Sequence, residues 1–122
     1  MATFRKFEEI NAWKKARLVT QKVYELTRHT GFSKDFGLKD QSTRAAVSIM
    51  ANIAEGHGRR TAKDFAYFLG VARGSAIELQ ALLYAAFDQE YVNQEEFRDL
   101  YSDLEEVSKM TVSLARYLRN SK

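Results

Sequence analysis

The segment LKDQSTRAAVSIMANIAEG, residues 38–56, decides the fold class that we predict for this chain. One set of its residues recurs at three- and four-residue spacings, the period of one face of an α-helix: Leu38, Ser42, Ala45, Ile49 and Ile53. The opposite side of this helix is also apolar, where a solvent-exposed helix would carry lysine or glutamate. We therefore predict a helix that is buried on more than one side.

Three further segments have the same helical period, over residues 9–30, 62–88 and 94–120. Short connections join the four segments, and no stretch shows the alternation of a β-strand. Amphipathic helices joined in this way form an antiparallel up-down-up-down four-helix bundle. We predict an all-α bundle in which residues 1–122 make a single domain, because a chain of this length suffices for one core and not for two.

The helix ends are predicted from their capping residues. Thr61 and Asn93 are the expected N-caps, each followed by an acidic residue in the first turn. Gly31 is expected to end the first helix, and Ser33 to cap one short turn in the connection 32–37. A glycine inside a helix costs ~1 kcal/mol relative to alanine, so we expect Gly70 and Gly74 to permit a close approach of another helix.

The composition excludes several classes of protein. The chain has no cysteine, which excludes a disulfide framework, a thiolate nucleophile and a cysteine metal site. Its first residues lack the pattern of a signal peptide, and no apolar run approaches the ~20 residues of a membrane span. We therefore expect a cytoplasmic protein that has no membrane segment.

The segment 62–88 carries more apolar surface than one bundle needs. Between Phe65 and Phe87 its only charged residues are Arg73 and Glu78. A contiguous apolar patch of this kind marks an interaction surface, so we expect other copies of the chain to cover it. The alternative is a well-filled core with scattered surface alanines. The expected interface residues are Val47, Met50, Ala51, Ala54, Val71 and Leu82.

Four motifs, taken together in their order and spacing, resemble a known family. They are Trp13-Lys14-Lys15-Ala16, Gln41-x-x-Arg44-Ala45-Ala46-Val47-Ser48-Ile49, Asn52-Ile53-Ala54-Glu55-Gly56 and Phe68-Leu69-x-x-Ala72-Arg73-Gly74-Ser75-x-x-Glu78-Leu79. From about residue 7 to residue 118 the chain resembles the bacterial four-helix-bundle proteins, also called 23S ribosomal RNA intervening-sequence proteins. That family is similar to the accessory variability determinant of diversity-generating retroelements, a basic barrel that binds nucleic acid and a reverse transcriptase.

The resemblance implies an assembly and a set of partners. It implies a cyclic homo-oligomer, a pentamer, whose expected partners are RNA or DNA and a protein such as a reverse transcriptase. It supplies no catalytic activity, active site or cofactor. The chain departs from the family at Ser33, where many members have proline, so the first connection is expected to be looser here.

Polar residues on the two central helices admit two interpretations. They are Arg44, Ser48, Asn52, Glu55, Ser75 and Glu78. Two carboxylates on adjacent helices could hold a metal or act as an acid–base pair. A di-metal site in a bundle, however, needs glutamates from all four helices and Glu-x-x-His motifs, which this chain lacks. We favour a structural layer of hydrogen bonds in which Arg44 neutralises a glutamate, and we expect no enzyme, metal or cofactor.

The charges separate toward the two ends of the predicted bundle. One end gathers eleven cationic and four anionic side chains, the other gathers five and nine, and Arg73 falls in the middle, where the charges cancel. A ring of basic ends would attract nucleic-acid phosphates without reading bases. The expected binding residues are Lys14, Lys15, Arg17, Arg59, Arg60, Lys63, Arg116 and Arg119. We expect a non-catalytic oligomer that binds RNA or DNA in this way, with a structural or protein-adaptor module as the alternative.

Overall fold

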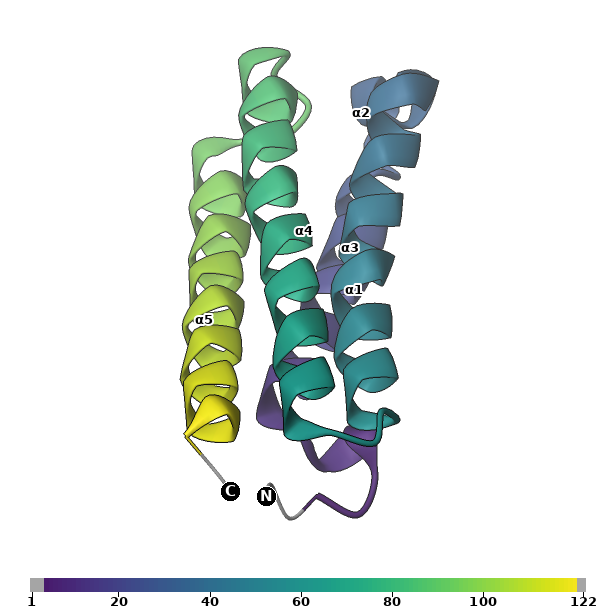
Figure 1. Ribbon diagram of the computed structural model, residues 1–122. Helices are drawn as coiled ribbons and strands as arrows, with labels where there is room; N and C mark the ends of the chain where they lie inside the picture. The colour runs from purple at the N-terminus through teal and green to yellow at the C-terminus, as the bar shows by residue number, and fades with distance from the viewer. Residues whose placement is uncertain (1–3, 121–122) are drawn as a thin grey trace.

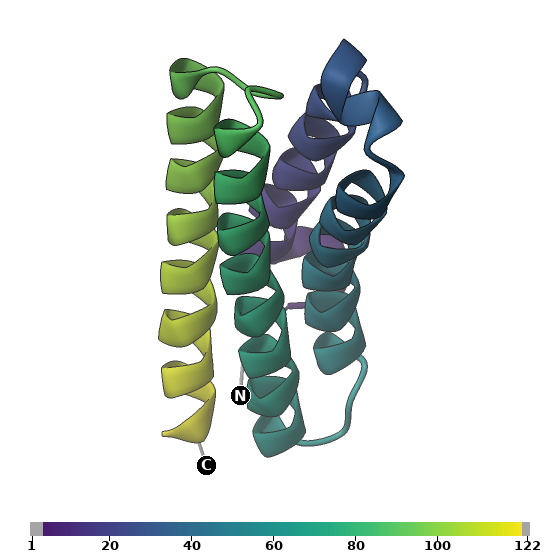
Figure 2. The ribbon, with the colours of Figure 1, turned by 90° about the horizontal axis from the view of Figure 1, so that it is seen from above.

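The computed structural model describes residues 4–120, which form six helical elements and no strand. The elements are η1 (Phe7–Glu9), α1 (Asn11–Leu26), α2 (Thr30–Lys34), α3 (Phe36–His57), α4 (Ala62–Asp88) and α5 (Gln94–Arg119). The four long helices α1, α3, α4 and α5 run alongside one another, and each is antiparallel to the next (Figure 1 and Figure 2). The helix α1 packs against α3 and α5, and α4 packs against the same two helices. The predicted all-α bundle is confirmed.

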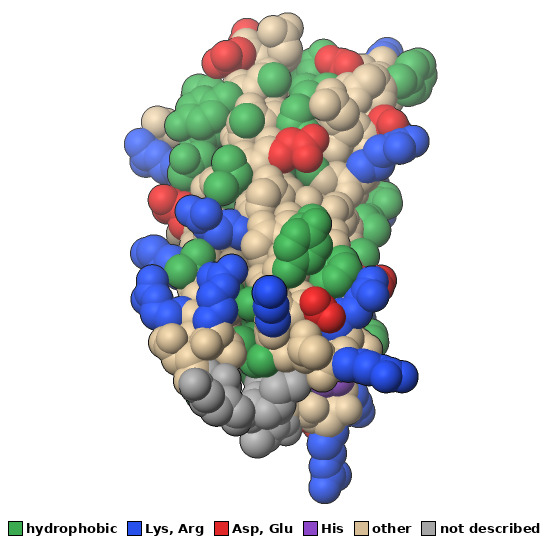
Figure 3. Space-filling model, viewed as in Figure 1, with side chains coloured by type: hydrophobic (Ala, Val, Ile, Leu, Met, Phe, Trp, Pro, Cys, Tyr) green, Lys and Arg blue, Asp and Glu red, His purple; other side chains and the backbone are tan. Residues whose placement is uncertain are grey.

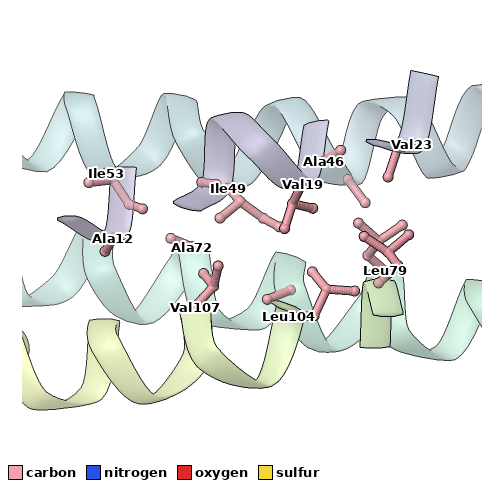
Figure 4. Close-up of a cluster of buried hydrophobic side chains, with 14 of the residues drawn as sticks. Ala12, Val19, Val23, Ala46, Ile49, Ile53, Ala72, Leu79, Leu104 and Val107 are labelled. Atoms are coloured by element: carbon pink, nitrogen blue, oxygen red, sulfur yellow. The ribbon is translucent and has the colours of Figure 1, made fainter. Parts of the chain in front are cut away.

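The core lies between the four long helices, and each of them contributes to it (Figure 4). Ile49 and Ile53 of α3 and Leu104 of α5 are completely buried, as the apolar stripes predicted. Buried alanines also contribute to this core, among them Ala16, Ala46, Ala66 and Ala72. None of the helices within residues 4–120 is long and apolar enough to cross a lipid bilayer.

Two predicted N-caps are confirmed by their hydrogen bonds. The Thr61 hydroxyl accepts a hydrogen bond from the Asp64 N–H at 3.0 Å. At the start of α5, the Asn93 side chain accepts from the Glu96 N–H at 2.8 Å, and the Glu96 carboxylate accepts from the Asn93 N–H at 2.9 Å. The bond from Asn93, helped by His29 at 2.8 Å, holds the pKa of Glu96 below its usual value.

The first helix ends earlier than predicted, at Leu26 instead of residue 30. The hydroxyl of the buried Thr27 donates to the Tyr24 carbonyl at 2.9 Å, which offers the backbone an alternative to the next helical bond. The chain becomes extended at His29 and then forms the short helix α2. Gly31 lies inside α2 without a positive φ, so the prediction that it ends a helix is wrong.

The helix α2 is not capped by Ser33, whose hydroxyl donates to the Thr30 carbonyl from within the helix. The buried Phe32 holds α2 in place by stacking on Tyr91 with 5.4 Å between ring centroids. The Tyr91 hydroxyl donates to the Asp35 carboxylate at 3.0 Å, and this bond raises the pKa of Tyr91. Because these contacts join the two connections at one end of the bundle, we call residues 27–37 and 89–96 the closed end.

A Schellman motif ends α4 and directs Tyr91 toward Phe32. The Tyr91 N–H donates to the Ala86 carbonyl at 2.9 Å, and the Glu90 N–H donates to the Phe87 carbonyl at 2.9 Å. Glu90 has a φ of 61°, in the left-handed region that favours glycine. The contacts of Tyr91 therefore hold a glutamate in a conformation that it rarely adopts.

The close approach of two helices occurs at Gly56, not at Gly70 and Gly74. A Cβ at Gly56 would lie 2.8 Å from the Phe68 Cβ and 2.9 Å from the Phe65 Cδ1, so only glycine allows α3 and α4 to come this close. A Cβ at Gly70 or Gly74 would meet no atom of another described helix within 4 Å. Within the bundle, the predicted close approach therefore does not occur at these two glycines.

Candidate nucleic-acid interface

Cationic side chains gather at the end of the bundle opposite the closed end, which we call the basic end. They come from the start of α1, the turn between α3 and α4, the first turn of α4 and the last turn of α5. In the view of Figure 3, lysine and arginine side chains concentrate toward this end and acidic ones toward the other. The cations that define the basic end are Lys14, Arg17, Arg59, Arg60, Lys63, Arg116 and Arg119, and all of them are exposed.

Most of these cations have no carboxylate close to them. Within residues 4–120, Arg59 is the one member of the set that has a carboxylate oxygen within 4.0 Å. Its guanidinium donates to Glu55 at 2.7 Å and lies 4.7 Å from the centroid of the Phe68 ring. Arg17 lies over the Trp13 ring at 6.0 Å. The remaining charges face solvent, where they are available to an anionic partner.

Lys15 differs from the other predicted binding residues because its ammonium group already forms ion pairs with two carboxylates. Its Nζ lies 3.1 Å from Asp103 and 2.9 Å from Glu106 of α5, and these two hydrogen bonds raise the pKa of Lys15. Lys22 binds the same Asp103 at 2.6 Å and Asp99 at 2.8 Å. Burial has the largest effect on Lys22 and lowers its pKa, but the bonds to Asp103 and Asp99 outweigh burial, so the net pKa is raised.

We call this group, Lys15, Lys22, Asp99, Asp103 and Glu106, the α1–α5 clamp. The sequence analysis did not identify the clamp, although one signal was present. Asp103 lies in the apolar stripe of α5, beside Leu104, and is itself buried. A carboxylate in such a position needs a partner, because burying an unpaired charge is costly. The clamp therefore joins two helices, and Lys15 is best removed from the candidate binding set.

The predicted polar layer is smaller than expected. Ser48 and Ser75 share a hydrogen bond of 2.8 Å between α3 and α4, and the Asn52 amide donates to the Ser48 carbonyl at 2.8 Å. These three residues are half-buried and form the structural layer.

The charged members of the layer lie elsewhere. Arg44 pairs with Asp40 at 2.9 Å instead of a glutamate, so that prediction is wrong. Glu55 pairs with Arg59, and Glu78 is exposed. The structure thus does not bring the two carboxylates together with Arg44. No cluster of three or more His, Cys, Asp or Glu side chains placed to hold a metal ion occurs within residues 4–120.

The residues predicted to bind another copy divide into two groups. Val47, Ala51 and Val71 are exposed, whereas Met50 and Leu82 are half-buried and pack against the core. Ala54 is half-buried. Other apolar side chains lie open on α4, and they are Tyr67, Ile77 and Tyr84, exposed by 64%, 46% and 51%.

Comparisons with known proteins give both a family and a fold. The model of the family described as 23S rRNA-intervening sequence protein matches residues 8–113. A solved structure from Bacteroides thetaiotaomicron, a protein with unknown function from the S23 ribosomal protein family, has the same fold with a TM-score of 0.80. It is 24% identical, and the match covers 86% of this chain and 98% of that one. No curated protein matches. The match over residues 8–113 shows that this chain belongs to the 23S rRNA-intervening sequence protein family.

Proposed function

We propose that the protein binds RNA or DNA through its basic end and has no catalytic role. The observation that carries the proposal is the gathering of exposed cations that have no carboxylate within 4.0 Å in residues 4–120, among them Arg60, Lys63 and Arg119. Cations of this kind attract phosphates irrespective of base sequence. When they neutralise these phosphates, the counterions that surround the nucleic acid are released. The resemblance also suggests a protein partner, such as a reverse transcriptase.

The test removes three charges at one end and compares that protein with one that loses three charges at the other. The first variant carries Arg60→Gln, Lys63→Gln and Arg119→Gln. The matched control carries Arg28→Gln, Lys34→Gln and Arg98→Gln, three exposed cations in or next to the closed end. The net charge is the same in both variants, so any difference reports where the charges lie.

Binding is measured by fluorescence anisotropy with a single-stranded RNA and with duplex DNA, at several salt concentrations. We expect the first variant to bind more weakly and to lose about 2 units from the slope of log K against log salt, at ~0.7 per phosphate contact on single strands. The control variant should keep the slope of the unmodified protein. Equal slopes in the two variants, or no binding by the unmodified protein at low salt, would leave the structural or protein-adaptor role as the better account.

We also infer that copies of the chain assemble through the open apolar faces of α3 and α4. The support is the exposure of Val47, Val71 and Ile77 at 42%, 37% and 46%. The resemblance suggests a cyclic pentamer. Light scattering tests the assembly, because a particle of 14.0 kDa would contradict it. Val47→Lys combined with Ile77→Lys should convert a larger particle to this size.

A further inference from the structure

A pocket of about 280 Å³ lies between α4 and the last turns of α5. Leu69, Thr111 and Ala115 line it and are buried, and Gly70 leaves one side open. Pockets for drug-sized ligands run to ≈ 300–1,000 Å³. The pocket therefore suits a small chemical group better than an extended ligand.

Three arginines line this pocket, and they come from distant parts of the sequence. Arg73 belongs to α4, and Arg116 and Arg119 belong to α5. None of the three has a carboxylate within 4.0 Å in the described part of the chain. The bundle topology thus brings three arginine side chains to the lining of one small pocket, although Arg73 by itself falls in the middle of the bundle, where the charges cancel.

The C-terminal end of α5 also lies at this pocket, and its partial negative charge repels an anion only weakly. A helix C-terminus carries roughly −0.5 of an elementary charge. Part of that end is satisfied, because the Asn120 N–H donates to the Arg116 carbonyl at 3.1 Å. Three guanidinium groups exceed this partial charge several times over. Planar guanidinium groups also match the oxygens of a phosphate, to which they donate two hydrogen bonds each.

We propose that this pocket is a phosphate seat, in which Arg73, Arg116 and Arg119 bind one phosphoryl group. In combination with the proposed function, the group is a phosphodiester of the bound nucleic acid. A free phosphate or a nucleotide has the same chemistry and is the other source of the group.

The test uses one variant that removes charge and one that fills space. Arg73→Gln removes one of the three guanidinium groups, and Arg98→Gln, next to the closed end, is its matched control. Gly70→Leu fills the pocket without changing the charge, and Gly74→Leu places the same side chain one turn farther on, outside the pocket. Leucine is a better helix former than glycine, so both leucine variants should fold. Circular dichroism and light scattering verify the fold and the particle size.

Three probes are titrated into each protein: a single-stranded RNA, adenosine monophosphate and inorganic phosphate. We expect Arg73→Gln and Gly70→Leu each to weaken RNA binding about tenfold, while both controls stay within about twofold of the unmodified protein. The leucine pair is the sharper comparison, because a diffuse positive field predicts no effect of Gly70→Leu.

The outcomes separate this inference from the proposed function. If the unmodified protein binds RNA and the two pocket variants bind it equally well, the phosphate seat is overturned and the proposed function stands. If RNA does not bind but phosphate or the nucleotide does, and Gly70→Leu abolishes that binding, the seat is supported and the proposed function fails. If no probe binds, both are overturned.

Discussion

The two ends of the bundle use their polar groups in different ways. At the closed end, Tyr91, Asp35, His29 and Glu96 all have partners within the chain. At the basic end, most cations have no carboxylate within 4.0 Å in residues 4–120. Paired groups stabilise the fold, whereas unpaired like charges contribute little to it and repel one another. The comparison indicates that the polar groups of the closed end support the fold, whereas most cations of the basic end are free to contact an anion.

The largest effect is expected at the closed end, from Tyr91→Ala. This change removes the ring that stacks on Phe32 and the bond to Asp35, and it should lower the free energy of unfolding by about 3 kcal/mol. Tyr91→Phe keeps the ring and should cost about 1 kcal/mol. Urea unfolding measures both. If Tyr91→Phe cost as much as Tyr91→Ala, the stacking contact would not be the source of stability.

A second effect tests the packing where α3 reaches the basic end. Gly56→Ala places a methyl group against Phe65 and Phe68 and should lower the free energy of unfolding by about 2 kcal/mol. Gly74→Ala, on open helix surface, should raise it by about 1 kcal/mol. The midpoints of thermal and urea unfolding should therefore fall for Gly56→Ala and rise for Gly74→Ala. A shift in the same direction would contradict the assignment of Gly56 as the packing glycine.

A third effect compares the two N-caps, because a carboxylate accepts one of the cap hydrogen bonds only at the closed end, where Glu96 accepts from the Asn93 N–H. The pKa of Glu96 is lowered in the folded state, so its stabilisation is present above the unfolded value of about 4.3 and is lost as pH falls through the folded pKa. We expect a loss of about 1 kcal/mol between pH 6 and pH 3 that Glu96→Gln does not show. Thr61→Ala, at the other cap, should cost the same at both pH values. The measurement is urea unfolding at the two pH values.

The smallest effect is expected when charge is removed at the basic end. Arg60→Gln combined with Lys63→Gln should change the free energy of unfolding by less than about 0.5 kcal/mol, because both side chains are exposed and have no carboxylate within 4.0 Å in the described residues. A loss above about 1 kcal/mol would show that these cations support the fold, and would weaken their assignment to a partner. Differential scanning calorimetry of the double variant and the unmodified protein measures this change in stability.

Periodicity predicted the long helices because the signal extends over many residues. It did not detect the break after Leu26, since Val23, Leu26 and Thr27 continue the apolar stripe without interruption. At the break, the Thr27 hydroxyl donates to the Tyr24 carbonyl, and the N–H groups of Arg28 and His29 donate to carbonyls only three residues earlier. The caps at Thr61 and Asn93 were predictable because a cap is a local feature.

The features missed by sequence analysis depend on the rotation of one helix against another. Lys15 and Asp103 lie in different helices, and no local rule indicates that they meet. Likewise, Arg73 reaches the pocket of Arg116 because α4 and α5 pack side by side. The spacing of residues along the sequence shows on which face of a helix a side chain lies, but not which residue of another helix it contacts.

The α1–α5 clamp has a practical consequence for work with this protein. Dissolved ions weaken interactions between exposed charges, with a Debye length of ~3 Å at 1 M, but they reach a buried pair much less. Asp103 is only 7% exposed, and both of its lysine contacts are no longer than 3.1 Å. A concentrated salt wash should therefore weaken the binding of any nucleic acid at the basic end more than it weakens the contacts of Asp103 with Lys15 and Lys22.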